Sequence, residues 1–222
     1  MSGETIAGRL AQVLARIAAA CERSGRSPQG VTLIAVSKGF SADAVREAVA
    51  AGVTHIGENR VQEAAQKRPA LEDPTGVTWH LIGHLQTNKV NAALGLFDVI
   101  HSVDSLRLAE AISNRALSNV PVFLEVNVSQ EPTKTGFSMQ ELPDAFRSAR
   151  HLHLDIRGLM TIAPLSKDPE DARPVFRDLR AAAHDLGLAG LSMGMTDDYE
   201  VAIEEGATHV RTGRAIFGER AE

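Results

Sequence analysis

Short apolar segments alternate with longer amphipathic segments at a regular interval along most of this sequence. The short segments predict strands that begin near Val31, Thr54, Thr78, Phe97, Pro121, Leu154, Gly190 and Thr208. Five of the segments between them are rich in Ala, Leu, Glu and Arg and predict helices: residues 42–51, 58–67, 105–117, 139–150 and 169–186. Strict alternation of strand and helix indicates a parallel sheet, and eight such units indicate an α/β fold of the closed (β/α)8 type, a TIM barrel.

A longer helical pattern precedes the first predicted strand. Its apolar residues recur at helical spacing: Ile6, Leu10, Val13, Leu14 and Ile17. Gly25 and Pro28 then mark its end. We therefore expect an extra N-terminal helix within residues 1–27 that packs on the barrel, as part of one domain spanning residues 1–222. An open doubly wound sheet is the alternative, but no G-x-G-x-x-G turn follows the first strand, where that fold would need it.

The charge balance and the single cysteine limit the partners and the compartment. The 222 residues carry 23 Lys and Arg against 28 Asp and Glu, so no excess of positive charge exists to bind nucleic acid or an anionic membrane. Cys21 cannot form an internal disulfide, and no apolar run approaches the roughly 18 to 20 residues of a membrane-spanning helix. We expect a cytoplasmic protein without nucleic-acid or membrane partners.

A lysine follows the first predicted strand. In the segment VTLIAVSK, residues 31–38, Lys38 comes directly after six mostly apolar residues and Ser37. An amine at the mouth of a dry barrel would lose solvation, which lowers its pKa toward the neutral form that attacks aldehydes as a Schiff-base nucleophile. The alternative is a lysine that extends from the strand end into solvent, and position alone favours that alternative.

Two small-residue loops follow the seventh and eighth predicted strands. Ser192 and Gly194 lie in the first loop, and Thr212 and Gly213 lie in the second. In many TIM barrels these two loops bind phosphate, because hydroxyls and backbone amides can approach the anion closely there. The same residue types also make ordinary turns. If both loops bind phosphate, they face Lys38 across the barrel mouth, and the ligand carries an aldehyde at one end and a phosphate at the other.

Further polar residues occur at strand ends. Asn59 follows the second predicted strand, where it could bond a ligand hydroxyl or cap the next helix. His80 could line the barrel interior as part of the site, but a histidine in an apolar run is more often a hydrogen-bonded core residue, and the same holds for His84 and His101. No His, Cys, Asp or Glu residues have convincing metal-ligand spacing, so we expect no metal.

Seven motifs occur in order along the chain: AVSK at 35–38, GENRVQE at 57–63, WHLIGHLQTNK at 79–89, KTG at 134–136, GLM at 158–160, LSMGM at 191–195 and VRTGRAIFG at 210–218. In these motifs the sequence closely resembles the pyridoxal phosphate homeostasis proteins, relatives of the N-terminal barrel of alanine racemase. The match covers nearly the whole chain. It implies that the chain binds pyridoxal 5′-phosphate (PLP) as a Schiff base on Lys38, and this outweighs the solvated alternative.

The resemblance also implies which other residues surround the cofactor. Ser192, Arg211, Thr212 and Gly213 match phosphate-side contacts, and Asn59 matches a residue close to the cofactor. Four further residues complete the set of cofactor-binding candidates: His80, Lys134, Met193 and Gly194. There are two departures from the family: Thr196 stands where serine is usual, and the sequence ends at Glu222 without the basic tail of some relatives. The first keeps a hydroxyl, and the second puts a role for that tail in doubt.

The resemblance suggests a carrier of PLP more than a catalyst. In related barrels the residue matching Arg211 faces the pyridine nitrogen and, being always charged, keeps it unprotonated, which weakens the electron sink. Alanine racemases also supply a catalytic tyrosine from an additional domain, whereas the sole tyrosine here, Tyr199, reads as a packing residue. We therefore expect a PLP homeostasis protein that carries the cofactor without strong catalysis, with PLP-dependent apo-enzymes as candidate recipients.

Two alternatives stay open. The first is a weak PLP-dependent amino-acid racemase, with Lys134 as the best candidate for a second amine. The second is a Schiff-base aldolase on the same barrel, which fits the lysine and the phosphate loops but not the motifs. Lys134 lies in a predicted irregular segment, residues 129–138, where a solvated loop lysine is favoured over a second PLP contact. Because the second domain of the racemase is missing, a monomer is expected.

Overall fold

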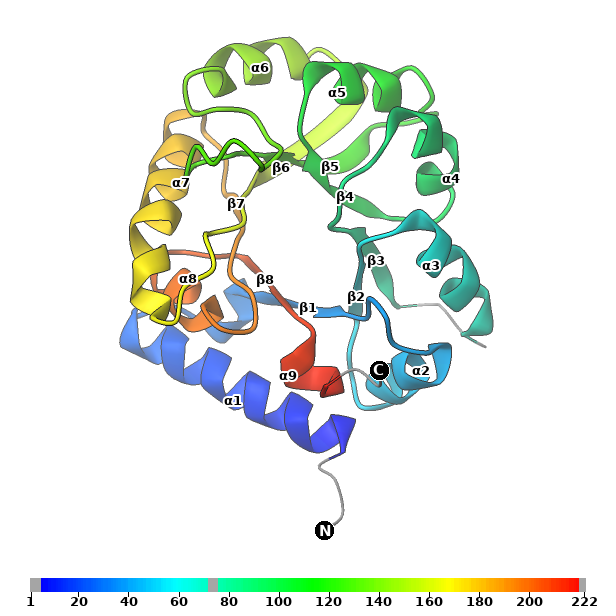
Figure 1. Cartoon of the computed structure of the whole chain (residues 1–222), viewed down its shortest axis with the longest axis vertical. Coiled ribbons are helices and arrows are strands. Elements are labelled where there is room, and N and C mark those ends of the chain that lie inside the picture. The colour runs from blue at the N-terminus through cyan, green and yellow to red at the C-terminus, as the bar shows by residue number, and fades with distance from the viewer. Residues whose placement is uncertain (1–4, 72–75, 220–222) are drawn as a thin grey trace.

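In the computed structural model, which describes residues 5–71 and 76–219, eight parallel strands close into a barrel in sequence order (Figure 1). Each strand pairs with the next, and β8 returns to pair with β1. The strands are β1 (Thr32–Val36), β2 (His55–Glu58), β3 (Thr78–Leu81), β4 (Val99–Val103), β5 (Val120–Glu125), β6 (Leu154–Met160), β7 (Gly190–Ser192) and β8 (His209–Thr212). The predicted TIM barrel is confirmed, and every strand begins within two residues of its predicted start.

The helices form the outer layer of the barrel. They are α1 (Ile6–Arg23), α2 (Ala42–Ala50), α3 (Val61–Lys67), α4 (Val90–Leu94), α5 (Leu106–Ser113), α6 (Leu142–Ala149), α7 (Arg173–Asp185), α8 (Tyr199–Glu204) and α9 (Arg214–Phe217). The predicted helix at 58–67 is wrong at its start, because Glu58 pairs with Leu81 as the last residue of β2. The predicted helix at 169–186 begins as a 3₁₀ turn, Pro169–Ala172, capped by Asp168. None of the helices in the described part of the chain is long and apolar enough to cross a membrane.

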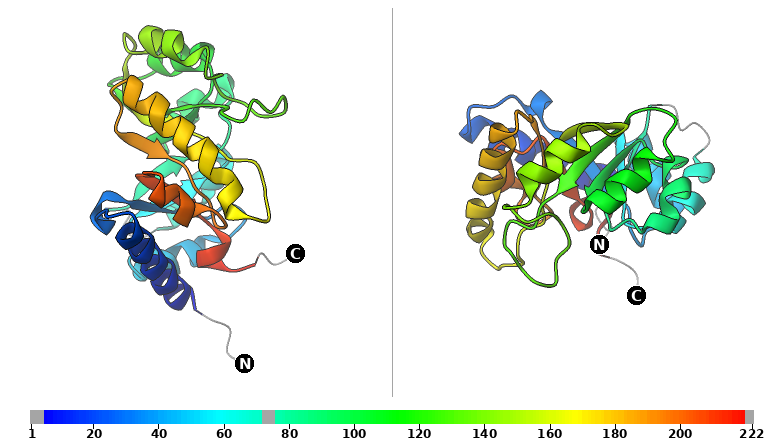
Figure 2. Two further views of the ribbon diagram at one scale, coloured as in Figure 1. Left: turned by 90° about the vertical axis from the view of Figure 1, so that its left-hand side faces the viewer. Right: turned by 90° about the horizontal axis from the view of Figure 1, so that it is seen from above.

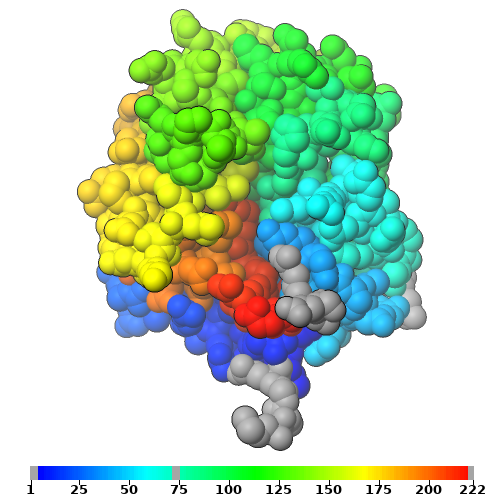
Figure 3. Space-filling model, viewed as in Figure 1, coloured from blue at the N-terminus to red at the C-terminus, as the bar shows by residue number. Residues whose placement is uncertain are grey.

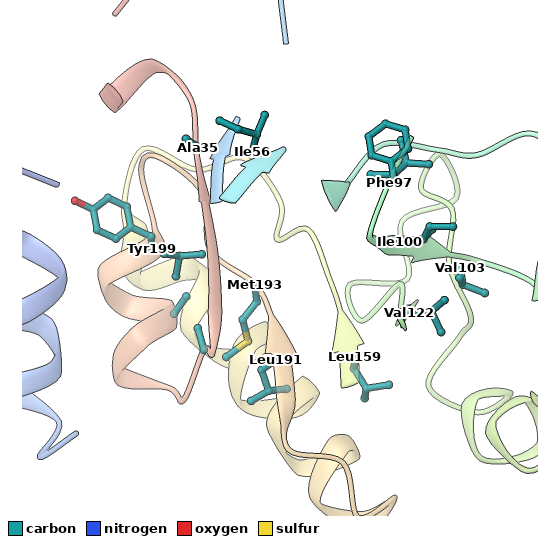
Figure 4. Packing of buried hydrophobic residues seen from close by; sticks show 14 of the residues in the cluster. Ala35, Ile56, Phe97, Ile100, Val103, Val122, Leu159, Leu191, Met193 and Tyr199 are labelled. Carbon is teal, nitrogen blue, oxygen red and sulfur yellow. The ribbon is translucent and has the colours of Figure 1, made fainter. Parts of the chain in front are cut away.

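The main core lies between the barrel and its helices. In Figure 4, side chains from the strands, among them Ile56, Ile100 and Leu159, occupy this layer. The barrel interior is different, because it holds imidazole rings beside a small apolar cluster. The ring of His101 stacks on that of Phe123, with centroids 4.4 Å apart. Apolar packing therefore stabilises the outside of the barrel, whereas polar side chains fill part of its inside.

Helix α1 contacts the two short helices that follow the last two strands, α8 and α9. The Arg9 guanidinium donates to the carbonyl oxygen of Ile216 at 2.7 Å, and Arg16 and Arg23 both pair with Glu200. Figure 2 shows that the loops after β5 (green) and β6 (yellow) project from the same face of the barrel as α9. Helix α1 thus packs on the barrel against α8 and α9, as expected of a helix within residues 1–27. Residues 1–4 lie outside the described residues.

Candidate functional site

A cavity of about 500 Å³ opens at the carboxyl ends of the strands, within the range typical of small-molecule sites. Figure 3 shows the face of the molecule on which this cavity opens. Its lining comes from the ends of β1 and β8 and from the segments that follow β1, β2, β3, β6, β7 and β8: Val36, Lys38, Phe40, Asn59, Ile82, Ile162, Met195, Thr196, Asp197, Arg211, Gly213, Arg214, Gly218 and Glu219. Four of the predicted site residues are therefore brought together on one cavity: Lys38, Asn59, Arg211 and Gly213.

Lys38 lies in a tight turn that leaves β1. The backbone N–H of Ser37 donates to the carbonyl of Gly57 at 3.0 Å, and the N–H of Phe40 donates back to Ser37 at 3.0 Å. Gly39 has φ = +76°, a conformation that favours glycine, so the chain turns sharply just after the lysine. The turn holds the half-buried Lys38 on the cavity wall, as the strand-end position predicts.

Arg211 provides a buried positive charge at the same cavity. Its side chain lies near the end of β8, and the residue is 4% exposed. One guanidinium nitrogen donates to Ser192 Oγ at 2.6 Å, and the other donates to the carbonyl of Thr161 at 2.8 Å. Burial lowers the pKa of Arg211 to about 10, and the carboxylates of Asp198 and Glu125 limit this decrease. Arg211 therefore remains a cation at neutral pH, in a fixed orientation.

Three imidazoles extend from Ser192 through the barrel interior. His101 Nδ1 lies 2.8 Å from Ser192 Oγ, His101 Nε2 lies 2.8 Å from His80 Nδ1, and His80 Nε2 lies 2.9 Å from His55 Nδ1. Burial lowers the pKa values of His80 and His101 well below the usual range, so both rings are neutral. His55, His80, His101 and Ser192 are called the imidazole chain below.

Two predicted cofactor contacts, His80 and Ser192, belong to the imidazole chain. The structure places His80 inside the barrel, where both ring nitrogens have imidazole partners, which fits the hydrogen-bonded core alternative. The Ser192 hydroxyl, fully buried, bonds His101 and Arg211 instead of pointing from the cavity wall. Ser192 thus acts on the cavity through Arg211. The two residues remain candidates, but their observed contacts are with protein groups.

The two small-residue loops place hydroxyls and glycine backbone at the cavity. Thr212 is buried next to the cavity, and its Oγ1 has no hydrogen-bond partner among the described residues. A Cβ at Gly213 would lie 3.0 Å from the Val36 carbonyl oxygen, so only glycine leaves this close approach of β8 to β1 relaxed. Thr196 adds a second hydroxyl-bearing residue to the lining. Hydroxyls and an unobstructed backbone fit a phosphate group, because an unpaired buried hydroxyl needs a partner.

Gly194 and Met193 lie behind the cavity wall, and Lys134 lies at the cavity rim. Gly194 has φ = +90°, and a Cβ there would lie 2.6 Å from the Cβ of Ala202, so packing against α8 requires this glycine. Met193 belongs to the outer core (Figure 4). Lys134 Nζ donates to Glu131 at 2.6 Å and to the carbonyl of Ile162, a lining residue, at 3.1 Å. Lys134 therefore ties the loop after β5 to the cavity rim.

Several residues near the cavity were not among the predicted site residues. Asp197 and Arg214 face each other across its edge at 3.0 Å, and Phe40 stacks on Phe217 with ring centroids 4.9 Å apart. Lys67 is the least expected, since it is buried directly behind the Lys38 turn. It lies on the buried face of α3, three residues from Ala64 and six from Val61, and this helical period is the signal that could have identified it.

Tyr199 lies away from the cavity. It is almost fully buried at the start of α8, and Arg16 of α1 lies over its ring at 5.3 Å from the centroid. Its hydroxyl has no hydrogen-bond partner among the described residues. Figure 4 shows the ring directed away from the strands, toward α1. The prediction that Tyr199 is a packing residue agrees with this position.

The closed barrel and the cavity at its carboxyl edge define a small-molecule-binding (β/α)8 protein. The chain belongs to the family described as alanine racemase, N-terminal domain, whose model matches residues 9–221. It is 46% identical to the pyridoxal phosphate homeostasis protein of Aquifex aeolicus, over 96% of this chain and 97% of that protein. It is 39% identical to the protein of the same name from Escherichia coli, over 97% of each chain. The resemblance seen in the motifs is thereby confirmed.

Solved structures give the same result. PipY of Synechococcus elongatus PCC7942, solved without and with PLP bound, is 41% identical, with TM-scores of 0.86 and 0.84. In both cases the match covers 96% of this chain and 100% of PipY. An alanine racemase from Clostridium difficile shares the fold, with a TM-score of 0.73 at 14% identity, over 96% of this chain and 57% of the racemase. The racemase thus continues well beyond the matched barrel.

Proposed function

We propose that this protein binds PLP in the cavity at the barrel mouth, holds it as a Schiff base on Lys38, and takes part in intracellular vitamin B6 homeostasis. One observation carries the proposal: Lys38 and the buried Arg211 line the same cavity, beside the unpaired hydroxyl of Thr212. An amine for an aldehyde, a hydroxyl for a phosphate and a fixed cation fit the three polar ends of this cofactor. Full-length similarity to proteins named for PLP homeostasis supports it.

Each side chain has a separate task in this arrangement. Lys38 supplies the amine, and Thr212, Gly213 and Thr196 receive the phosphate. Asn59 lies on the wall between Lys38 and the β3 side, where its amide can bond a ring substituent. Five further residues complete the set: His80, Ser192, Met193 and Gly194 support the wall from behind, and Lys134 supports it at the rim.

The environment of Arg211 favours a carrier over a catalyst. PLP supplies an electron sink to its enzymes, and this sink is strongest when a carboxylate keeps the ring nitrogen protonated. Arg211 is a cation with no hydrogen-bond acceptor to offer, so it disfavours a proton on a neighbouring nitrogen. Its two bonds to Ser192 and Thr161 leave it little freedom to move away. Tyr199 packs against Arg16 of α1 and is not part of the cavity lining.

The setting of the protein is part of the proposal. We infer a cytoplasmic location, supported by a sequence whose one cysteine, Cys21, is buried as a thiol. We also infer a single-domain monomer that delivers PLP to apo-enzymes dependent on it. The cavity opens at the barrel mouth, and such an opening would allow transfer.

Absorbance and isotope exchange test the proposed function. Purified protein mixed with PLP should develop the visible absorbance of a protein Schiff base. In D₂O, the PLP-loaded protein should then catalyse exchange of the Cα hydrogen of free amino acids no faster than PLP alone does. Absence of the absorbance band would refute PLP binding. A normal band with enzyme-like exchange would instead establish the weak racemase.

A further inference from the structure

The residues on both sides of Lys38 are hydrogen-bonded to one cluster of charged side chains. The Ser37 hydroxyl donates to Glu58 Oε1 at 2.5 Å, and the Ser37 carbonyl accepts from Lys67 Nζ at 2.7 Å. On the other side, the backbone N–H of Gly39 donates to Glu63 Oε2 at 2.8 Å. The residues before and after Lys38 are therefore both held by side chains from β2 and α3.

Lys67 joins these contacts into one unit. Its ammonium group contacts Glu58 Oε1 at 2.6 Å and Glu63 Oε2 at 3.3 Å, in addition to the Ser37 carbonyl. A lysine ammonium has three hydrogens, and here each hydrogen has one acceptor. The Lys67 side chain is 8% exposed and that of Glu58 is 0% exposed, so water contributes little to either group. Glu58, Glu63 and Lys67 are called the turn clamp below.

Stability alone does not explain a turn clamp at this position. The buried face of α3 is otherwise made by Val61 and Ala64, so an apolar residue at 67 would pack in the usual way. Desolvation of a buried ion pair costs about as much as the pair returns, and apolar replacements of such pairs are often neutral or stabilising. Burial raises the pKa of Glu58 despite the hydrogen bonds from Lys67 and Ser37, which is the sign of that cost. The clamp therefore calls for a role other than net stabilisation.

We propose that the turn clamp positions Lys38, with Lys67 as the central positioning residue. It fixes the peptide units on both sides of Lys38, and so sets the direction in which the amine enters the cavity. The clamp does not contact the cavity itself, because none of its three residues is part of the lining. This inference rests on the proposed function, since positioning matters only if Lys38 is the attachment point for PLP.

The variant Lys67→Met tests the proposal, because it keeps most of the side-chain length and removes all three hydrogen bonds. Two ligands separate positioning from general damage: PLP, which has an aldehyde, and pyridoxine 5′-phosphate, which lacks it. Rapid borohydride quenching followed by peptide mass spectrometry gives the rate at which PLP attaches to Lys38. We expect this rate to fall about tenfold to a hundredfold, as for a misplaced reacting group, with affinity for pyridoxine 5′-phosphate unchanged.

The controls make every outcome decisive. Lys167→Met, which changes an exposed loop lysine, should behave as the parent protein. If Lys67→Met does not fold, Glu63→Met replaces it, because that side chain, 25% exposed, can be removed while the buried pair of Lys67 and Glu58 stays intact. An unchanged attachment rate, or an equal loss of pyridoxine 5′-phosphate affinity, overturns the positioning role. Failure of the parent protein to attach PLP to Lys38 would instead refute the proposed function.

Discussion

The two sides of the cavity are held in opposite ways. On the Lys38 side, the turn clamp is charged, and it acts on the backbone of the neighbouring residues, Ser37 and Gly39. On the Arg211 side, the imidazole chain is neutral and reaches the functional side chain itself through Ser192. The difference shows two ways of preparing a cofactor site. A reactive amine can be positioned through its backbone, whereas a permanent charge is immobilised through its own hydrogen-bond donors.

The neutral character of the second side follows from its position. A second cation beside Arg211 would be repelled in a medium of low polarity. Burial is the main reason that His101 stays uncharged, and repulsion from neighbouring imidazoles and from Arg211 adds to it. On the Lys38 side, the Lys67 ammonium group lies against the carboxylates of Glu58 and Glu63, so opposite charges offset one another there.

The largest expected effect is on the charged side. Lys67→Met leaves Glu58 buried without its cation and should lower the free energy of unfolding by about 3 to 5 kcal/mol. Adding Glu58→Leu to this variant should recover most of the loss, because no unpaired charge then remains. Urea denaturation of the two single variants and the double variant measures the coupling. Strictly additive losses would mean that the clamp is not one unit.

Acidification should weaken the neutral side. Burial lowers the pKa of His209, which lies edge-on to His101, to about 4. The unfolded chain has a histidine pKa of about 6.5, so it binds a proton that the native state rejects. Stability is therefore complete above about pH 6.5 and falls by up to about 1.4 kcal/mol per pH unit for each such histidine as the pH drops toward 4. His209→Phe should flatten this dependence in denaturation curves, and an unchanged slope would contradict the assignment.

Breaking the imidazole chain should lower the free energy of unfolding less than breaking the turn clamp does. His101→Phe keeps the stacked ring beside Phe123 but leaves His80 and Ser192 each without one buried partner. Unfolding free energy should fall by about 1 to 3 kcal/mol. The exposed His184 supplies a matched control, since His184→Phe should change stability by less than about 0.5 kcal/mol. A loss as large as that of Lys67→Met would remove the contrast between the two sides.

The smallest effect is expected at Thr212. Its buried hydroxyl lacks a partner among the described residues, so the isosteric change Thr212→Val should leave the unliganded protein equally stable or slightly more stable. Affinity for PLP should nevertheless fall about tenfold, the value of one hydrogen bond of roughly 1.4 kcal/mol. Calorimetric unfolding and fluorescence titration check the two halves. A stability loss without an affinity loss would show that the hydroxyl serves the fold instead of the ligand.

The sequence predicted the outline of both sides but not what holds them. Strand periodicity placed Lys38 and Gly213 at strand ends, and the closed barrel then necessarily brought them to one edge. The turn clamp was missed because a Glu63–Lys67 pair, spaced four residues apart, resembles an ordinary exposed helix pair. The imidazole chain was missed because its members come from different strands, and the rotation of each strand decides whether a side chain points inward. For the same reason, the bonds of Ser192 to His101 and Arg211 were not predicted.

Mapping the attachment point of PLP tests the central claim most directly. The protein is mixed with one equivalent of PLP, reduced with borohydride, digested and analysed by mass spectrometry. The account predicts one dominant modified peptide, carrying the reduced cofactor on Lys38. An adduct spread over exposed lysines, or concentrated on Lys134 while Lys38 stays unmodified, would contradict it.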